Sequence, residues 1–431
     1  MNAVSSIGGT TAAGIAASVR DLVDVGRLGA GDALPPIRSL SQELGVNRNT
    51  VAAAYRLLVA AGVAETHGRG GTVIAAVPDA ARDGASARPG LVDLASGNPD
   101  PRLLPDVVEY VRGYEASLYG TPAEHAGLAA WARGALGEEL PGPFGVVVTH
   151  GAVDAIERLL AMHLTRGDAV AVEDPCFLAH ISTLRLNGFT AIPVAVDQCG
   201  MSARGLSDAL EAGARAVICT PRAQNPTGAS LKAERAEALR AVLVRHPHAL
   251  VIEDDHLWAL STAGYHRITP PELPRWALVR SVAKFLGPDL RLAVVAADEE
   301  TVDRLHARLG PATTWVSHLL QHAVAGMLDD PRVERLRQTA RAAYAARATS
   351  LVDALRRRSI EVSIAPDGLN VWIETAATAD ALAARGWRVR PANAFAVGAT
   401  IDAVRVTTST LTEQQAEAFA ADLQEAACSQ A

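Results

Sequence analysis

Apolar residues near the start of the chain recur every three or four positions, as they do on one face of a helix. They predict a first helix that would be ended by the segment 26–32 and whose apolar face holds Ile15, Val19, Leu22 and Val25. Pro35-Pro36 favours the start of a second helix at 37–44, and Gly45 favours its end. A third helix should begin after Asn47, a favourable cap, and should present Val51, Tyr55, Leu58 and Val59 on one face.

A two-stranded hairpin should follow, because the β-rich runs 63–66 and 72–75 flank His67-Gly68-Arg69-Gly70-Gly71. Two helices that meet across a glycine turn and are followed by a hairpin predict a winged helix-turn-helix. The second helix of the pair, here the third helix of the chain, should enter the major groove of DNA with its N-terminal residues leading. The candidate DNA contacts are Arg38, Asn47, Arg48, Asn49, Thr50, Arg69 and Gly70. A small protein-interaction module is the alternative, since residues 1–75 contain six arginines against five acids.

The rest of the chain has a different pattern, in which short β-rich runs alternate with helical stretches from Phe144 onward. The predicted strands are 146–148, 169–172, 216–219, 250–252, 278–279 and 292–296, and helices at 152–164 and 177–187 follow the first two. This alternation predicts an α/β fold with a mostly parallel sheet covered by helices on both faces. Ligands in such sheets lie at the carboxyl ends of the strands.

Composition supports two folded domains joined by a linker. The chain has 431 residues, of which 49% are hydrophobic and 20% charged, which excludes wholesale disorder. Residues 76–90 lack large apolar side chains, so we expect a DNA-binding domain at 1–75 and a second domain at 91–431. The sequence has no apolar run long enough to span a membrane and no signal segment, which predicts a cytoplasmic protein. The four cysteines are widely spaced and show no metal-ligand pattern, so no metal site is expected. The net charge of −7 means that DNA binding must rest on the motif.

Polar groups with a common chemistry follow the strands of the second domain. Gly151, Ala152 and Val153 open a helix whose backbone N–H groups can hold a phosphate. Asn225, Asp254 and Lys284 each follow a predicted strand, and Arg291 comes seven residues after the lysine. Pyridoxal phosphate needs these parts: an amine for the Schiff base, a carboxylate for the pyridine nitrogen and an arginine for the phosphate. Each part alone is weak, because such an aspartate can be a helix cap and such an arginine a surface ion pair.

The amine is the most informative part. Of the 40 basic residues only Lys232 and Lys284 are lysines, and a guanidinium cannot replace an amine in a Schiff base. Lys232 adjoins a charged helix at 233–240 and should be exposed, whereas Lys284 comes just after a strand that should be buried.

Both parts of the chain resemble known families. The string LPPIRSLSQELGVNRNTVAAAYRLLVAAGVAETHGRGGTVI resembles the GntR-type DNA-binding domain along its whole length. NPTG, EDDH and S-x-x-K with an arginine seven residues later resemble the fold-type I aminotransferases, over about residues 90–425 and with a smaller C-terminal α/β subdomain. A GntR-like head on an aminotransferase-like body is the architecture of the MocR regulators. The strings NRNTVAAAY, VEDPCF, TPRAQNPTG and LGPDLRLA most resemble its PtsJ-type members, which are linked to vitamin B6 metabolism through pyridoxal kinase.

The resemblance implies a role for each matching residue. Lys284 would form the Schiff base, Asp254 would pair with the pyridine nitrogen, Asn225 would donate to the phenolic oxygen, and Phe177 would stack on the ring. The phosphate would be held by Gly151, Ala152, Val153, Ser281 and Arg291. Tyr119 would reach the phosphate from the other subunit of a homodimer, and Arg405 in VRVT would take a substrate or effector carboxylate.

Two residues depart from the family pattern. His256 stands where many relatives have a tyrosine bonded to the phenolic oxygen, and its imidazole would tune the imine differently. Ala283 replaces the hydroxyl residue that is usual before the lysine. Both changes weaken the expectation of efficient turnover more than the expectation of cofactor binding. The leading hypothesis is therefore a regulator that binds promoter DNA and senses pyridoxal phosphate or a carboxylate effector. The alternatives are an active aminotransferase with an accessory head, and a scaffold that has lost the cofactor.

Overall fold

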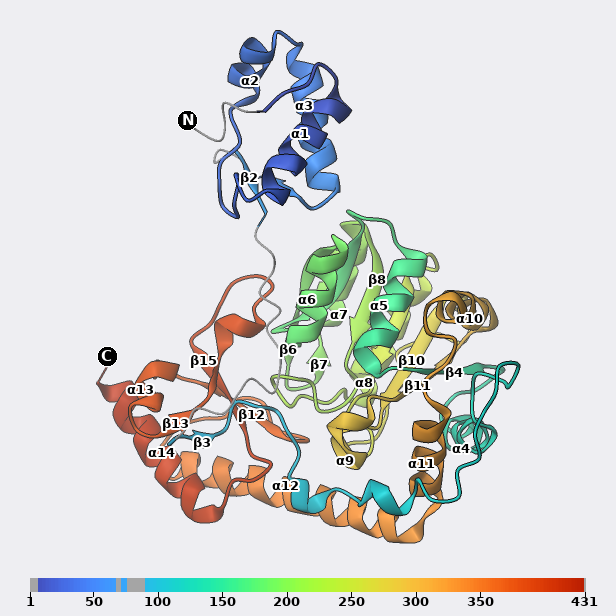
Figure 1. The fold of residues 1–431 in the computed structure, drawn as a ribbon. Helices are drawn as coiled ribbons and strands as arrows, with labels where there is room; N and C mark the ends of the chain where they lie inside the picture. Colours follow the sequence, from blue (N-terminus) through green and yellow to red (C-terminus); the bar gives the residue numbers. More distant parts are fainter. Residues whose placement is uncertain (1–6, 67–70, 76–89, 430–431) are drawn as a thin grey trace. The chain divides into compact units, whose positions relative to one another are not determined.

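The computed structural model describes residues 7–66, 71–75 and 90–429. The chain separates into two compact units, a head that contains residues 7–75 and a body that contains most of the residues after 90 (Figure 1). The linker predicted at 76–90 lies almost entirely outside the described residues, as do Arg69 and Gly70 of the predicted wing.

The head is a three-helix unit with a short antiparallel hairpin. Its elements are α1 (Ala12–Asp24), α2 (Ile37–Leu44), α3 (Arg48–Ala60), β1 (Ala64–Thr66) and β2 (Thr72–Ile74). Gly45 ends α2 in the left-handed region at φ 66°, and Asn47 begins α3 by accepting a hydrogen bond from the N–H of Asn49 at 2.8 Å. The Tyr55 hydroxyl donates to the carbonyl of Pro35 at 2.6 Å and so fixes α3 against the start of α2.

The core of the head confirms most of the predicted apolar face. Ile15, Val19, Val51 and Leu58 are fully buried, and Leu22 and Tyr55 are nearly so. The prediction is wrong for Val25, which is 69% exposed because α1 has ended at Asp24 and the chain turns away. It is also wrong for Val59, which is 37% exposed because it lies about 100° around α3 from the buried Leu58.

The body is built on an eight-stranded, mostly parallel sheet in the order β4-β11-β10-β9-β8-β5-β6-β7. Its strands are β4 (Gly145–Thr149), β5 (Ala169–Asp174), β6 (Thr190–Asp197), β7 (Gly200–Met201), β8 (Ala214–Cys219), β9 (Leu250–Asp254), β10 (Trp276–Ser281) and β11 (Ala293–Ala297). The five strands from β10 to β6 are parallel to one another, whereas β11, β4 and β7 join by antiparallel pairing. The inner parallel strands β5, β8, β9 and β10 are almost wholly buried and rich in Val, Ile and Ala, as two covered faces require, whereas β6 is largely exposed or half-buried.

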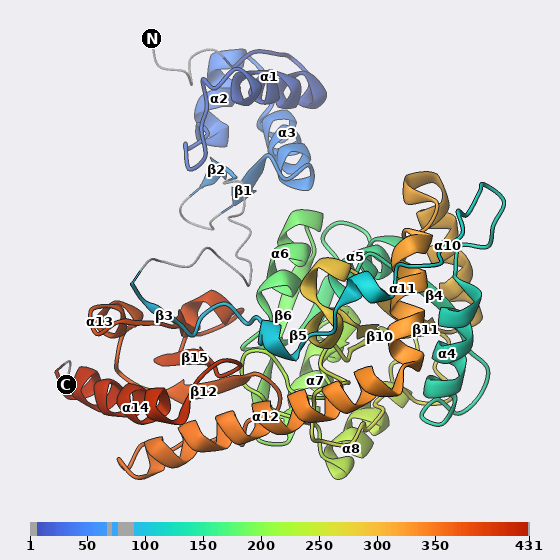
Figure 2. The ribbon, with the colours of Figure 1, turned by 60° about the horizontal axis from the view of Figure 1, so that its bottom comes forward.

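Helices cover this sheet on both faces (Figures 1 and 2). They are α4 (Ala126–Gly137), α5 (Ala152–His163), α6 (Leu178–Asn187), α7 (Ala203–Glu211), α8 (Ala233–Val244), α9 (Ala283–Leu286), α10 (Glu299–Thr313) and α11 (His318–Asp329). Lys232 precedes α8 and is exposed, as predicted.

A smaller C-terminal α/β subdomain completes the body. It holds the sheet β12-β15-β14, formed by β12 (Asn370–Glu374), β14 (Arg390–Pro391) and β15 (Ala403–Thr407), and the helices α13 (Ala379–Ala383) and α14 (Glu413–Cys428). The long helix α12 (Pro331–Arg356) joins the two parts of the body (Figure 2). Its Tyr344 packs in the core of the large sheet and its Leu351 in the core of the small one. A short parallel pair, β3 (Val92–Asp93) with β13 (Trp387–Arg388), ties the start of the body to this subdomain.

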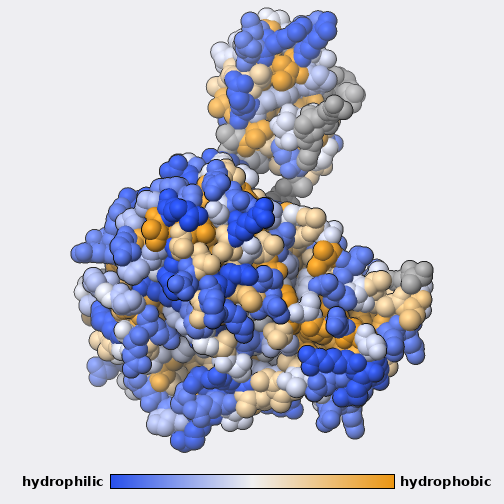
Figure 3. Space-filling model, turned by 180° about the vertical axis from the view of Figure 1, so that it is seen from behind, coloured by the Kyte–Doolittle hydropathy of each residue, from blue (hydrophilic) through white to orange (hydrophobic). Residues whose placement is uncertain are grey.

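The surface seen in Figure 3 is mainly hydrophilic, with smaller hydrophobic areas scattered among the polar side chains. Within the described ranges, no helix combines the length and the apolar character that a membrane crossing would need.

Candidate functional site

Strand ends of the large sheet bring the predicted cofactor residues together. The parallel neighbours β9 and β10 end at Asp254 and Ser281, so both residues lie at the same edge of the sheet. Lys284 follows in the short helix α9, and its Nζ donates a hydrogen bond of 2.7 Å to the carbonyl oxygen of Gly97. The only lysine that was expected to react thus follows the strand that pairs with β9, at the edge of the sheet where Asp254 lies.

Asp254 is buried and faces two imidazoles. Its Oδ2 lies 3.1 Å from Nε2 of His180, which α6 supplies, and 3.5 Å from Nδ1 of His256. Burial would raise the pKa of Asp254, but the facing imidazoles of His256 and His180 hold that pKa well below its usual range. Asp254 therefore remains an anion, and its other oxygen, Oδ1, is buried without a hydrogen-bond partner in the described part of the chain.

The ring of Phe177 packs between these two imidazoles. It lies edge-on to His180, with 5.2 Å between centroids, and nearly parallel to His256, at 6.0 Å and 14°. The aromatic residue that was predicted to stack on the cofactor therefore lies next to Asp254.

Arg405 contacts Asn225 and the loop that holds Lys284. Its side chain is fully buried on β15, where Nη1 donates to Oδ1 of Asn225 at 3.0 Å and Nη2 donates to the carbonyl of Ala95. Two residues further on, the carbonyl of Gly97 accepts from Lys284. The loop 95–97 thus connects the amine with the arginine that was predicted to take a carboxylate.

The predicted phosphate-binding residues also lie together. The helix α5 begins after Gly151, which has φ 93° and provides no side-chain cap for the first N–H groups of this helix. A Cβ added to Gly151 would lie 3.8 Å from Nη2 of Arg291, which places the guanidinium next to the start of α5. Arg291 itself is exposed and adopts the left-handed region at φ 45°. A helix N-terminus with an adjacent arginine is a favourable place for a phosphate.

Tyr119 is not brought to these residues within one chain. Its side chain is 91% exposed, and its ring lies 5.6 Å from that of Trp315. The prediction that Tyr119 acts in the other subunit of a homodimer stays a prediction.

The candidate DNA contacts lie on the surface of the head. Arg38, Asn47, Arg48 and Asn49 are exposed at the starts of α2 and α3, and Thr50 is half-buried. Asn47 serves mainly as the cap of α3, which leaves Arg48 and Asn49 as the leading side chains of the recognition helix.

Three residues of the site were missed from the sequence. His180 comes three residues after Phe177, so one helical turn places both near Asp254, and that spacing could have indicated it. Ala95 and Gly97 act through backbone carbonyls, which no side-chain pattern reveals.

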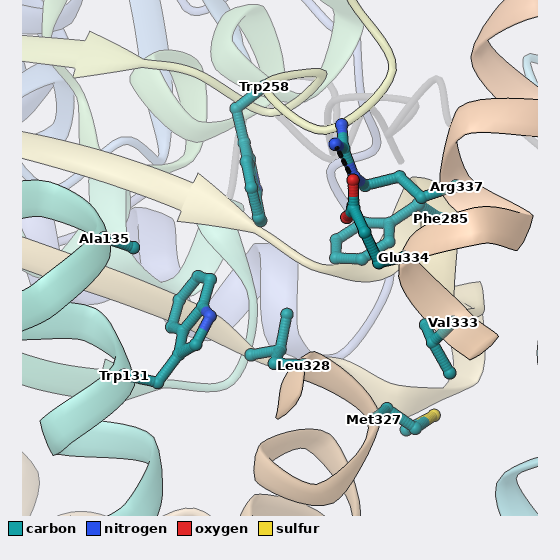
Figure 4. A pocket seen from close by; sticks show the side chains of 9 residues that line it. All are labelled: Trp131, Ala135, Trp258, Phe285, Met327, Leu328, Val333, Glu334 and Arg337. Atoms are coloured by element: carbon teal, nitrogen blue, oxygen red, sulfur yellow. Dashed lines mark hydrogen bonds and ion pairs between the residues drawn. The ribbon is translucent and has the colours of Figure 1, made fainter. Parts of the chain in front are cut away.

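A separate apolar pocket of about 240 Å³ lies nearby (Figure 4). It is lined by Trp131, Ala135, Trp258, Phe285, Met327, Leu328, Val333, Glu334 and Arg337. Trp258 separates it from the strand end, because its Nε1 donates to the carbonyl of Ser281 at 2.9 Å. None of the predicted cofactor residues lines this pocket.

The site fits pyridoxal phosphate. Oδ1 of Asp254 is a buried acceptor that needs a donor, Lys284 supplies an amine, and the start of α5 with Arg291 can hold a phosphate. When bound, this cofactor supplies an aldehyde for the amine and a protonated ring that withdraws electrons. The chain's own residues would orient the ring through Asp254 and Asn225 and would bind a carboxylate through Arg405.

Comparison with known proteins agrees with both parts of the fold. Residues 92–423 match the model of the aminotransferase class I and II family, and residues 11–74 match the bacterial regulatory proteins of the gntR family. Kynurenine aminotransferase from Pyrococcus horikoshii superimposes with a TM-score of 0.72 at 20% identity, over 79% of this chain and 91% of the other. LysN, the α-aminoadipate aminotransferase of Thermus thermophilus, gives 0.68 at 24% identity, over 79% and 93%.

Full-length relatives share the head as well as the body. The vitamin B6 salvage pathway transcriptional repressor PtsJ of Salmonella typhimurium is 47% identical over 97% of this chain and 99% of its own length. The pyridoxine biosynthesis transcriptional regulator PdxR of Corynebacterium glutamicum is 29% identical over 78% of this chain and 77% of its own. The fold and the site thus define a pyridoxal-phosphate-type aminotransferase body joined to a GntR-type DNA-binding head. The chain belongs to the MocR-type family of transcriptional regulators, and the predicted fold class and cofactor are confirmed.

Proposed function

We propose that this chain represses or activates genes of vitamin B6 salvage, pyridoxal kinase among them, in response to pyridoxal phosphate. The head would bind promoter DNA through Arg38, Arg48, Asn49 and the wing, and the body would capture the aldehyde with Lys284. A homodimer, completed by Tyr119, would present two heads to a pair of half-sites. The observation that carries the proposal is that a gntR-family match at residues 11–74 and an aminotransferase class I and II match at residues 92–423 occur in one chain, which is 47% identical to the repressor PtsJ.

The proposed response requires that the ligand bind two conformations of the protein with different affinity. A ligand shifts a conformational equilibrium only by as much as it prefers one conformation over the other. Lys284 and Arg405 are linked through the loop 95–97, so a ligand that engages the amine, the arginine or both acts on one connected set of contacts. A carboxylate-bearing amino compound that reacts with the cofactor would use Arg405 as its second contact.

The second candidate function is an aminotransferase. It is favoured by the contacts of Lys284 and Arg405 with the same loop 95–97, by the hydrogen bond between Arg405 and Asn225, and by the buried carboxylate of Asp254. A half-reaction assay with amino acids separates the two functions. Steady conversion to the oxo acid supports the enzyme, whereas a slow and partial spectral change supports the sensor.

The first experiment is the visible absorption spectrum of the purified protein with added pyridoxal phosphate. The chain offers a matched control, because it contains only two lysines. Lys284→Ala should abolish the absorption band of the lysine-bound cofactor, and Lys232→Ala, at an exposed position before α8, should retain it. A band that survives Lys284→Ala would rule out the proposed capture, and the absence of a band from the unsubstituted protein would leave only the scaffold hypothesis.

A further inference from the structure

His256 faces Asp254 in a way that the sequence did not predict. It stands where many relatives have a tyrosine bonded to the phenolic oxygen of the cofactor, and it was expected to tune the imine differently. Its Nδ1 lies 3.5 Å from Oδ2 of Asp254, the same oxygen that His180 approaches to 3.1 Å. One carboxylate oxygen thus lies within ion-pair distance of two imidazoles, and the other, Oδ1, has no hydrogen-bond partner among the described residues.

The surroundings favour the charged form of His256. Burial lowers the pKa of its imidazole and Lys284 lowers it further, but the facing Asp254 carboxylate outweighs both, and the net shift is upward. Asp255, the other nearby acid on this strand end, is already paired. Its Oδ1 accepts from Arg222 Nε and its Oδ2 from Arg280 Nε, each at 3.0 Å. The cation on His256 is therefore balanced mainly by Asp254.

A carboxylate that already faces a cation is a weaker partner for a second one. The protonated pyridine nitrogen of pyridoxal phosphate is such a second cation, and only Oδ1 remains to receive it. The catalytic power of this cofactor depends on that proton, because the protonated ring is the electron sink. If Asp254 faces both the imidazolium of His256 and the pyridine nitrogen, the cofactor ring should withdraw electrons less strongly. The capture of the aldehyde by Lys284 should be unaffected.

We propose that His256 is a positioning residue whose imidazolium, together with His180, holds Oδ2 of Asp254, directs Oδ1 to the pyridine nitrogen and weakens the hold of the carboxylate on the ring proton. This makes the site a better sensor than catalyst. The inference rests on the proposed function, because it requires that pyridoxal phosphate binds at Lys284.

The test is a spectrophotometric pH titration of the bound cofactor. The His256→Gln variant replaces the competing cation with a neutral amide. The apparent pKa of the pH-dependent change in the visible absorption of the bound cofactor should therefore rise by about half a unit or more. His256→Tyr, which introduces the residue expected at this position in many relatives, should shift the transition in the same direction. The matched control is His248→Gln, at an exposed position after α8, which should titrate like the unsubstituted protein.

The outcomes separate this inference from the proposed function. A raised midpoint in the two His256 variants, with an accelerated half-reaction toward amino acids, supports the role of His256. A visible band with an unchanged midpoint in both variants overturns the inference and leaves the proposed cofactor binding intact. No band in the unsubstituted protein overturns both. Thermal melting of each variant shows whether it is folded, and the tyrosine variant provides the answer if the glutamine variant does not fold.

Discussion

Arg405 donates a hydrogen bond to Asn225 across the site, with 3.0 Å between Nη1 and Oδ1. The two residues lie 180 positions apart in the chain, and both are buried. The guanidinium, which was predicted to take a carboxylate, therefore fixes the amide that was predicted to face the phenolic oxygen of the cofactor.

Replacement of Arg405 should separate effector binding from cofactor capture. Arg405→Gln removes a charge-assisted contact worth about 1.5–3 kcal/mol, so the affinity for a carboxylate ligand should fall roughly ten- to one-hundred-fold. The lysine-bound cofactor should still form, with a shifted spectrum because Asn225 loses its donor. A titration of the visible band with a simple carboxylate such as maleate measures this. Unchanged affinity would remove Arg405 from the effector site.

Arg48 tests the orientation of the head on DNA. It is exposed at the first position of α3, whose leading residues should reach base edges in the major groove. Arg48→Ala should weaken specific binding by about 1–3 kcal/mol at fixed salt. Arg56→Ala removes the same charge two turns further along the same helix and should cost less. Equal losses for the two variants would show that α3 does not lead with its N-terminus.

Glu173 should make the stability of the body depend on pH. Burial raises the pKa of this carboxyl from 4.5 to about 7, although its Oε1 accepts a hydrogen bond of 3.1 Å from the N–H of Thr220. The folded chain therefore holds this proton more tightly than the unfolded chain does. The corresponding stability is present below about pH 4.5 and is lost as the pH rises through about 7.

Glu173→Gln should flatten this dependence. The free energy of unfolding of the unsubstituted body should decrease between pH 5 and pH 8 by more than that of the variant. Urea denaturation at the two pH values measures the difference, with Glu237→Gln on the exposed side of α8 as the control. Parallel changes in all three proteins would show that Glu173 does not titrate in this range.

Much of the site could be predicted because strand ends are visible in sequence. Asp254 and Ser281 end β9 and β10, and Lys284 follows directly, so one pattern of apolar runs located all three. The contact between Arg405 and Asn225 could not be located in this way, since it joins the two sheets of the body. The partners of Lys284 and Arg405 in the loop 95–97 are backbone carbonyls, which any residue type provides.

The contact of His256 with Asp254 could not be predicted from the family pattern. That pattern suggested which cofactor atom the side chain at this position would face, and it gives no information on protein groups near an imidazole, which is shorter than a phenol. A charged ring is drawn to the nearest buried carboxylate, here Asp254. Similarly, Val25 fits the helical spacing of α1, but the helix ends one residue earlier. Periodicity locates a buried face and does not locate the last turn.

We propose that pyridoxal phosphate, captured by Lys284, controls DNA binding. The most direct test is the affinity of the full-length protein for its promoter fragment, measured at fixed salt with and without pyridoxal phosphate. We expect a change of roughly fivefold or more for the unsubstituted protein. Lys284→Arg, which keeps the positive charge but cannot form the bond, should show none. Isotherms of the unsubstituted protein that coincide with and without the cofactor would contradict the claim.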